Sequence, residues 1–229
     1  ADLQPDLLVV CDYGEILKPA TLEVPVRGGI NLHGSLLPKY RGAAPVQWAI
    51  LNGETETGNT VIQMTPGLDA GPCLGQQRIA IDPNETAGEL EARLAEAGAS
   101  LVLEVVDQID TNSPKPVPQD AVQASKAPRL TKEHGAVDWT QSAQAVKNQV
   151  RALQPWPRAY TFWREAPGEP LRMILHRVEL ASAPVNDSPP GTVIEADTRL
   201  LVAAADGAIE LLSVQAAGGR AMTGAEFLR

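Results

Sequence analysis

Two side chains in this sequence, Asn31 and His33, have the types and the spacing to do chemistry together. They fall in an alternating run that is typical of a β-strand, and residues at i and i+2 on a strand point to the same face. Gly34 follows them, and glycine allows the chain to turn sharply. The sequence therefore predicts an amide and an imidazole side by side at the end of a strand.

An asparagine amide donates hydrogen bonds without titrating, whereas an imidazole can donate, accept and exchange a proton. Together they suit the stabilisation of an oxyanion while a proton moves. A nearby carboxylate would favour the charged imidazole and fix its tautomer. Asp69 is the best candidate, because it lies 36 residues after His33 in the glycine-rich loop 67–71. That separation fits a strand–helix–strand connection, which can return the chain to the same sheet edge.

The residues alone leave a structural interpretation open. Asparagine and histidine often form turns at strand ends, and aspartate in a glycine-rich loop is often a turn residue. The other histidines, His134 and His176, are expected to be structural or exposed, and no cluster of residues has metal-ligand spacing. Acyl-type transfer and simple binding at a polar strand end therefore both remain possible.

The elements around these residues predict an α/β fold. Strands that alternate with helices favour βαβ units and a mostly parallel sheet, which binds ligands at the carboxyl ends of its strands. We expect strands over residues 7–10, 29–33, 59–64 and 78–81, a short helix from Pro45 and a long helix after Thr86. The long helix carries a hydrophobic stripe at helical spacing, made by Leu90, Leu94, Leu101, Val105 and Ile109.

A proline-rich stretch predicts the domain boundary. Three prolines within residues 114–118 favour an extended spacer, so we expect a first domain over 1–110, a linker over 111–124 and a second domain over 125–229. The second domain begins with one expected helix, 142–153. Short expected strands follow, which is typical of a small barrel or sandwich, at 159–163, 171–180, 191–196, 200–204 and 209–214.

Composition narrows the function classes. The 229 residues are 44% hydrophobic, and no apolar run approaches the roughly 20 residues of a membrane span. Two cysteines without metal-ligand spacing and no secretory leader predict a reduced, cytoplasmic setting. The net charge of −9 is uneven: residues 1–124 carry 7 basic and 17 acidic side chains, whereas residues 125–229 carry 12 and 11. Only the C-terminal half could therefore offer a basic face to a nucleic acid.

The stretch from Asn31 to Gly42 resembles the signature of the folate-dependent formyltransferases, and Gly67-Leu68-Asp69-Ala70-Gly71 resembles their second motif. Ala43-Ala44-Pro45, Gln63-Met64 and the run 151–157 resemble the members that act on methionyl-tRNA. The resemblance implies a Rossmann-like sheet of the formyltransferase type, followed by a small OB-like barrel used on tRNA. Because the family begins with further strands and helices, we expect the catalytic domain here to lack its N-terminal part.

By this resemblance, the formyl group of 10-formyltetrahydrofolate, a co-substrate, would pass to the methionine amino group of initiator methionyl-tRNA, with no metal, membrane or obligate protein partner. Asn31 and protonated His33 would stabilise the oxyanion, and Asp69 would keep His33 charged. The residues implied for folate binding are Tyr13, Ile16, Leu17, Ser35, Leu36, Leu37 and Pro38. Those expected to touch tRNA phosphates are Lys126, Arg129, Lys147 and Arg151.

Two other functions compete with this one. A sister formyltransferase that acts on an amino-sugar nucleotide resembles the chain in the same loop and also has a C-terminal barrel. A non-catalytic folate- or RNA-binding remnant is the alternative from a different class, and the short N-terminal part makes it plausible.

Overall fold

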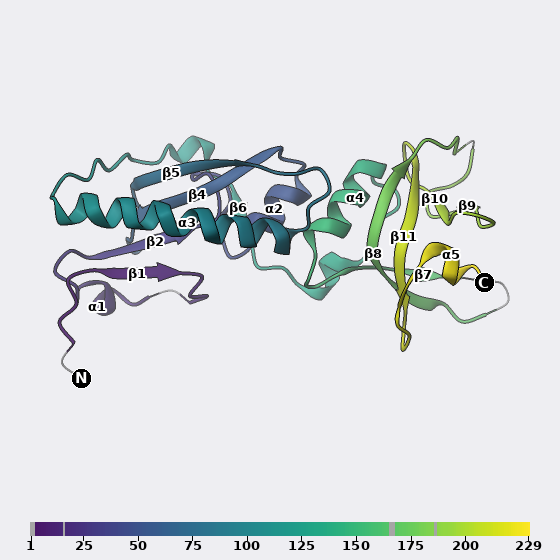
Figure 1. The fold of residues 1–229 in the computed structure, drawn as a ribbon, viewed down its shortest axis with the longest axis horizontal. Helices are drawn as coiled ribbons and strands as arrows, with labels where there is room; N and C mark the ends of the chain where they lie inside the picture. The colour runs from purple at the N-terminus through teal and green to yellow at the C-terminus, as the bar shows by residue number, and fades with distance from the viewer. Residues whose placement is uncertain (1–2, 16, 165–167, 186) are drawn as a thin grey trace. The chain divides into compact units, whose positions relative to one another are not determined.

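The computed structural model describes residues 3–15, 17–164, 168–185 and 187–229 (Figure 1). Its contacts divide the chain into two compact units. The first unit comprises Ala1–Ala49, Glu54–Pro83 and Glu89–Arg129, and the second comprises Ile50–Gly53, Asn84–Gly88 and Leu130–Arg229. The last segment of the first unit, Glu89–Arg129, therefore includes the proline-rich residues 114–118.

The first unit is built on a four-stranded sheet in the order β1-β2-β4-β5. The strands are β1 (Leu8–Cys11), β2 (Gly29–His33), β4 (Glu56–Gln63) and β5 (Cys73–Ala80). Their positions confirm the expected α/β fold, but the sheet is mixed rather than mostly parallel. Within this sheet only β1 and β2 pair in parallel, whereas β2 with β4 and β4 with β5 are antiparallel. The loop 64–72 between β4 and β5 is too short for the crossover of about a dozen residues that a parallel pair needs.

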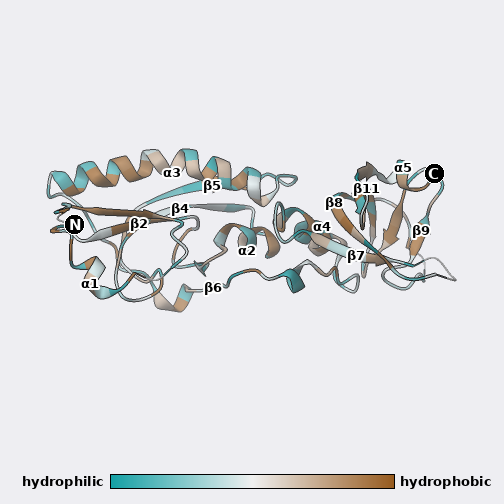
Figure 2. Ribbon diagram, turned by 90° about the horizontal axis from the view of Figure 1, so that it is seen from below, coloured by the Kyte–Doolittle hydropathy of each residue, from teal (hydrophilic) through white to brown (hydrophobic). Residues whose placement is uncertain are grey.

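One face of this sheet is covered by α3 (Ala87–Asp110), the long helix that the hydrophobic stripe predicts (Figure 2). Ile30 of β2 packs with Leu101 and Val105 of α3 in one buried cluster, and Leu32 packs against it. Side chains alternate along a strand, so Asn31 and His33 lie on the opposite face of β2. The core of the first unit thus fixes the side of the sheet on which the polar pair is presented.

Shorter elements complete the first unit. They are α1 (Pro19–Leu22), α2 (Pro45–Leu51), the 3₁₀ turn η1 (Ala121–Gln123), and the strands β3 (Arg41–Gly42) and β6 (Lys126–Ala127), which pair in parallel. The proline-rich segment is extended, but it is also hydrogen-bonded along the first unit. Val117 exchanges two main-chain hydrogen bonds with Cys73, each 2.8 Å long. This segment is therefore extended, as expected, and is paired with β5 of the first unit at Val117.

The second unit is an antiparallel β-domain, as the short strands predict. Its sheet has the order β7-β8-β11-β10-β9, and β12 pairs with β11. These strands are β7 (Ala159–Trp163), β8 (Leu171–Ala181), β9 (Val193–Glu195), β10 (Leu201–Ala203), β11 (Ala208–Ala216) and β12 (Ala221–Thr223). Three helical segments accompany them: η2 (Lys132–Gly135), α4 (Ala143–Ala152) and α5 (Gly224–Phe227).

Helix α4 is capped at its N-terminus by Ser142, whose hydroxyl accepts from the Ala145 amide at 3.1 Å. Val146 and Val150 of α4 pack with Leu175 and Ile209 of the sheet in the core of the second unit. Within the described ranges, no helix is both long and apolar enough to span a membrane.

Candidate active site

The structure brings His33 and Asp69 together, although they are far apart in the sequence. His33 ends β2 and is 6% exposed, and its Nδ1 lies 3.7 Å from Asp69 Oδ2. Asn31 is on the same face of the same strand, two residues earlier. The three polar residues singled out from the sequence therefore lie on the face of the sheet opposite α3.

The tautomer of His33 is fixed by a main-chain group rather than by Asp69. His33 Nε2 lies 2.8 Å from the carbonyl oxygen of Tyr40. A carbonyl oxygen only accepts, so Nε2 must carry the proton and donate it. The separation of 3.7 Å to Asp69 is too long for a hydrogen bond. The expectation that Asp69 fixes the tautomer is therefore wrong. Asp69 lies on the Nδ1 side of the ring, beyond hydrogen-bond distance.

Asp69 is held in place by the amide of Gly42, which donates to Asp69 Oδ2 at 2.9 Å. Gly42 has a φ of +126°, and a Cβ added there would lie 2.5 Å from the carbonyl oxygen of Ala127. Only glycine satisfies both constraints without movement of the backbone. Gly42 thus allows β3 to approach β6 closely while its N–H points at the carboxylate.

Tyr40, whose carbonyl orients His33, is itself tied down. Its amide donates to Ser125 Oγ at 2.9 Å, and its hydroxyl donates to Glu54 Oε1 at 2.8 Å. Lys39 donates to the same Glu54 oxygen at 2.9 Å. Burial raises the pKa of the Glu54 carboxyl, but the hydrogen bonds from Lys39 and Tyr40 outweigh burial, so that pKa lies below its ordinary value.

The loop that the sequence assigns to folate is braced from beneath by β4 and β5. Ser35 is fully buried, and its hydroxyl donates to the carbonyl of Lys39 at 2.6 Å. Thr60 donates to the Ser35 carbonyl at 2.6 Å and accepts from the Leu37 amide at 3.2 Å. Gln76 donates to Thr60 Oγ1 and to the Leu37 carbonyl. The loop 35–38 is therefore hydrogen-bonded by two buried hydroxyl groups, those of Ser35 and Thr60, and by the exposed Gln76.

The remaining residues expected at the folate site differ in exposure. Leu37 is buried, Leu36, Pro38 and Leu17 are half-buried, and Tyr13 is exposed. Ile16 lies outside the described residues. Direct contact of these residues with folate stays a prediction.

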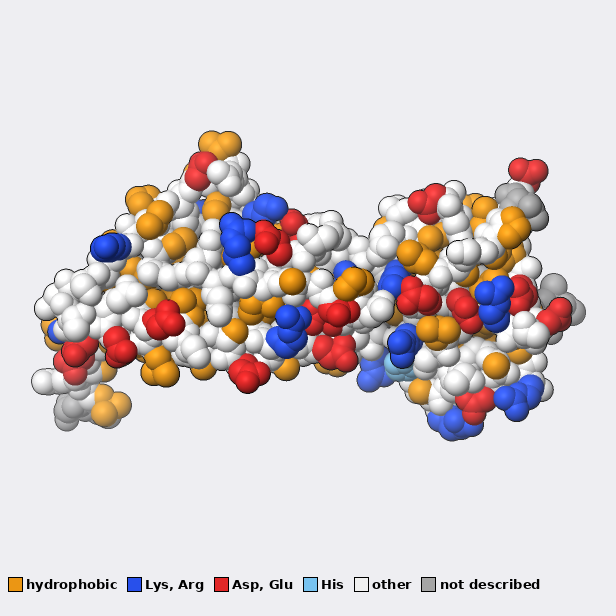
Figure 3. All heavy atoms as spheres, turned by 45° about the horizontal axis from the view of Figure 1, so that its top comes forward, with side chains coloured by type: hydrophobic (Ala, Val, Ile, Leu, Met, Phe, Trp, Pro, Cys, Tyr) orange, Lys and Arg blue, Asp and Glu red, His pale blue; other side chains and the backbone are white. Residues whose placement is uncertain are grey.

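The four residues expected at tRNA phosphates fall into two kinds of environment. Lys126 and Arg129 are exposed in the first unit, whereas Lys147 and Arg151 are buried on α4 of the second unit. On the face that Figure 3 shows, basic and acidic side chains are interspersed rather than segregated. Their contacts with tRNA stay a prediction, and the exposed pair is the more accessible.

Both buried cations have partners inside the second unit. Lys147 donates to Glu179 Oε1 at 2.5 Å, and this hydrogen bond lowers the pKa of the Glu179 carboxyl. Arg151 donates to Asn148 Oδ1 at 3.1 Å and to the Glu85 carbonyl at 3.2 Å. These hydrogen bonds and the burial of both side chains make Lys147 and Arg151 less accessible to a phosphate than Lys126 and Arg129.

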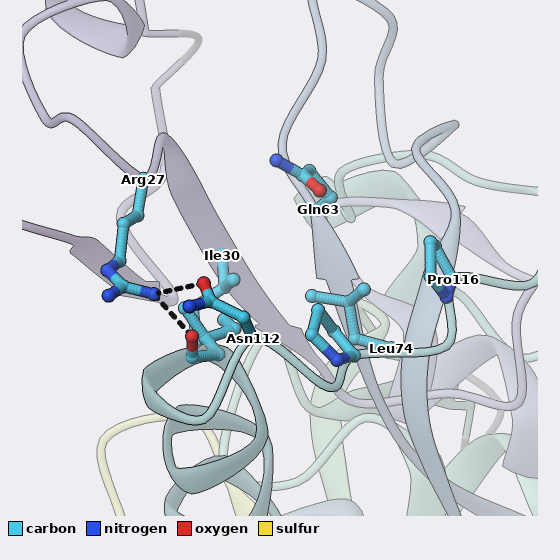
Figure 4. A pocket seen from close by; sticks show the side chains of 8 residues that line it. Arg27, Ile30, Gln63, Leu74, Asn112 and Pro116 are labelled. Atoms are coloured by element: carbon cyan, nitrogen blue, oxygen red, sulfur yellow. Dashed lines mark hydrogen bonds between the residues drawn. The ribbon is translucent and has the colours of Figure 1, made fainter.

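A separate pocket lies near the end of α3 (Figure 4). Its lining includes Ile30, Leu74 and Gln63, and Arg27 donates across it to Asn112 Oδ1 at 3.1 Å and to the Ile109 carbonyl. Because Ile30 faces α3, this pocket is on the other side of the sheet from Asn31 and His33. It is therefore distinct from the candidate site.

The groups that hold the polar residues in place cannot be predicted from residue types. The Tyr40 carbonyl and the Gly42 amide belong to the main chain, so residue types and spacing give no signal for them. Thr60 lies directly opposite His33 in the β2–β4 register. It does not stand out in the sequence, because β4 is rich in polar residues and also buries Thr57 and Asn59.

Comparisons with known proteins agree with this geometry. The family described as "Formyl transferase" matches residues 1–106, and "Formyl transferase, C-terminal domain" matches residues 129–229. The methionyl-tRNA formyltransferase of Rhodopirellula baltica is 43% identical over 235 residues, which cover 100% of this chain and 70% of that protein. The chain belongs to the methionyl-tRNA formyltransferase family. The family member of Roseiflexus castenholzii is 42% identical over 100% of this chain and 72% of its own length.

Solved structures show the same fold. HypX from Aquifex aeolicus, in complex with tetrahydrofolic acid, has a TM-score of 0.71 at 20% identity and covers 98% of this chain and 38% of its own. The sugar 3N-formyltransferase WlaRD, solved with dTDP and 5-N-formyl-THF, has a TM-score of 0.71 at 22% identity and covers 89% of this chain and 71% of its own. The expected formyltransferase-type fold is therefore confirmed, and membership of the family makes the chain an enzyme of formyl transfer.

Proposed function

We propose that this chain transfers the formyl group of 10-formyltetrahydrofolate to the amino group of methionine on initiator methionyl-tRNA. The observation that carries the proposal is the His33–Asp69 pair, 3.7 Å apart, on the same sheet face as Asn31. Relatives at 42–43% identity over the whole chain bear the name of this activity. Among the sugar formyltransferases, WlaRD is similar at 22% identity, which supports the fold alone.

The arrangement suits the chemistry of formyl transfer. The methionine amine attacks the formyl carbon, a C–N bond forms, and the formyl oxygen becomes an oxyanion. The Asn31 amide and the Nδ1–H group of protonated His33 donate hydrogen bonds to that oxygen, since Nε2–H is already bound to the Tyr40 carbonyl. The oxyanion then collapses, the bond to the folate nitrogen breaks, and the proton lost by the amine is returned to that nitrogen.

His33 can exchange this proton through one nitrogen only. Its Nε2 is committed to the Tyr40 carbonyl, so Nδ1 is the nitrogen that takes up and releases a proton. The Asp69 carboxyl group lies on the Nδ1 side of the ring, 3.7 Å away. Asp69 is itself kept in place by the Gly42 amide, so it does not need to move during the reaction.

We assign two segments to the binding site of the folate co-substrate: the loop Ser35–Pro38 and the segment from Tyr13 to Leu17. The hydrogen bonds from Thr60 and Gln76 support the first assignment, because they fix the loop before any ligand arrives. Pre-organisation of this kind lowers the entropy cost of binding. Two structural neighbours, HypX and WlaRD, were solved with tetrahydrofolic acid and 5-N-formyl-THF respectively.

For tRNA, we assign phosphate contacts first to the exposed Lys126 and Arg129. Replacing both by alanine should weaken tRNA binding and reduce the salt dependence of binding, because each phosphate contact releases counterions. Lys147→Met serves as the comparison, since Lys147 is held by Glu179. If Lys147→Met weakens binding as much as the double variant at equal stability, the preference for the exposed pair is wrong.

The decisive experiment offers the protein 10-formyltetrahydrofolate with either methionyl-tRNA or an amino-sugar nucleotide, and follows the release of tetrahydrofolate. We expect release with methionyl-tRNA only. Release with the amino-sugar nucleotide alone would replace the acceptor in the proposal. Folate binding without turnover on either acceptor would favour the non-catalytic remnant.

A further inference from the structure

The carboxamide of Gln119 joins two segments that meet at the candidate site. Its Nε2 donates to the carbonyl oxygens of Asp69 and Gly71, both at 2.7 Å. Its Oε1 accepts from Arg41 Nε at 3.1 Å and from Arg41 Nη2 at 2.7 Å. Both amide hydrogens and both lone pairs of the oxygen are therefore used.

This arrangement permits only one orientation of the amide. If the amide were flipped, its oxygen would face two carbonyl oxygens and its N–H groups would face a guanidinium group. Gln119 is also well anchored along the chain, because Val117, two residues earlier, is paired with Cys73 by two main-chain hydrogen bonds. The position of the carboxamide is thus set by the first unit and not by the candidate site alone.

The segments joined by Gln119 are the ones that place the Asp69 carboxylate. Asp69 has a φ of +46°, a backbone conformation that residues with side chains rarely adopt, so it persists only where the surroundings hold it. Gln119 binds the main-chain carbonyl of Asp69, while the Gly42 amide binds its side chain. Arg41, the other partner of Gln119, directly precedes Gly42 in β3. Both ends of the Asp69–Gly42 contact are therefore fastened to the same carboxamide.

We propose that Gln119 is a positioning residue for formyl transfer, which acts by holding Asp69 beside His33. The inference rests on the proposed role of Asp69 in the reaction. The segment that follows the prolines would then contribute one side chain, that of Gln119, to the arrangement of the active site. Gln119 itself does not touch the reacting atoms.

Two substitutions separate the two sets of hydrogen bonds that Gln119 makes: those that its Nε2 donates to the carbonyls of Asp69 and Gly71, and those that its Oε1 accepts from Arg41. Gln119→Glu keeps oxygen acceptors for Arg41 but removes both donors and turns a carboxylate toward the carbonyls of Asp69 and Gly71. Gln119→Met removes both sets of hydrogen bonds with little change in volume. Gln123 supplies matched controls, because it is exposed on the same segment and its amide donates to the neighbouring Asp120. The controls are Gln123→Glu and Gln123→Met.

The experiment measures kcat and KM for 10-formyltetrahydrofolate and for methionyl-tRNA, together with thermal unfolding. We expect both Gln119 variants to lower kcat by about 10- to 100-fold and to change either KM by less than about threefold, because positioning acts on the transition state. The Gln123 variants should retain the kcat of the unsubstituted protein. A normal kcat for Gln119→Glu would show that the hydrogen bonds to the carbonyls of Asp69 and Gly71 are not needed, and this would overturn the proposal.

A double variant distinguishes positioning from a general loss of structure. In the Asp69→Asn background, Gln119→Met should lower kcat by less than about threefold, since the carboxylate that it positions is already gone. An undiminished effect in that background would overturn the proposal. If Asp69→Asn alone leaves kcat unchanged, the proposed role of Asp69 fails and this inference fails with it. If Asp69→Asn is impaired but both Gln119 variants are not, only this inference fails.

Discussion

His33 Nε2 donates to the main-chain carbonyl of Tyr40 at 2.8 Å, and this single hydrogen bond decides which nitrogen of the imidazole can take part in chemistry. Nε2 is occupied by this bond, and the other ring nitrogen, Nδ1, lies 3.7 Å from Asp69 Oδ2. Tyr40 is held in turn by Ser125 and Glu54. The nitrogen of His33 that remains available, Nδ1, is therefore determined by Tyr40 and its partners and not by Asn31 or Asp69.

Asn31→Ala should lower kcat for formyl transfer by two to three orders of magnitude. The substitution removes one oxyanion donor, which costs about 3–4 kcal/mol in the barrier. The KM for methionyl-tRNA should change little, because the interaction forms in the transition state. Steady-state kinetics with 10-formyltetrahydrofolate measures both quantities, and near-normal turnover would remove Asn31 from the mechanism.

Gly42→Ala should both destabilise the first unit and impair turnover. The new Cβ would lie 2.5 Å from the Ala127 carbonyl oxygen at a φ of +126°, so β3 must shift and carry its amide away from Asp69. We expect a loss of about 2–4 kcal/mol in the free energy of unfolding, measured with urea. Gly28→Ala is the matched control, since it also has a positive φ but its nearest neighbour is a side-chain atom of Gln63 at 3.4 Å. Equal losses for the two variants would mean that backbone strain alone, and not the contact with Ala127, sets the cost.

The polar residues of the site were predictable from the sequence because their spacing on β2 and the motif around Asp69 are visible in residue types. The strands and the long helix were predictable for the same reason, since hydrophobic periodicity reports on burial. The direction of β4 was not, because antiparallel pairing with β2 depends on the path of the chain and not on local pattern. The prolines predict the extended conformation of the segment that contains them, but not its contacts. That segment pairs with Cys73 and clamps Asp69 through contacts that arise only once the fold is formed.

Thr60→Val should loosen the loop that we assign to folate. The hydroxyl of Thr60 is buried and serves Ser35, Leu37 and Gln76 together, so its loss leaves buried polar groups unpaired. We expect a cost of about 1–3 kcal/mol in unfolding free energy, and a KM for 10-formyltetrahydrofolate that rises while the KM for methionyl-tRNA does not. Thr57→Val, a buried residue on the same strand outside this network, is the control. A rise in both KM values, or in neither, would argue against the loop as a folate-specific element.

Glu54→Gln should lower the free energy of unfolding, by an amount that depends on pH. The pKa of Glu54 is lowered in the folded state, so its carboxylate contributes stability above the unfolded pKa of about 4.3, and this contribution is lost as the pH falls through the folded pKa. We expect the variant to be less stable by about 1 kcal/mol at pH 7, and the difference to shrink below about pH 4. Urea unfolding at several pH values tests this, with Glu56→Gln as the control, because the ion pair of Glu56 with Arg78 is exposed on both sides. A difference that stays constant down to pH 3 would show that the Glu54 charge is not what holds Lys39 and Tyr40, and the bracing of the His33 partner would then have to come from Ser125 alone.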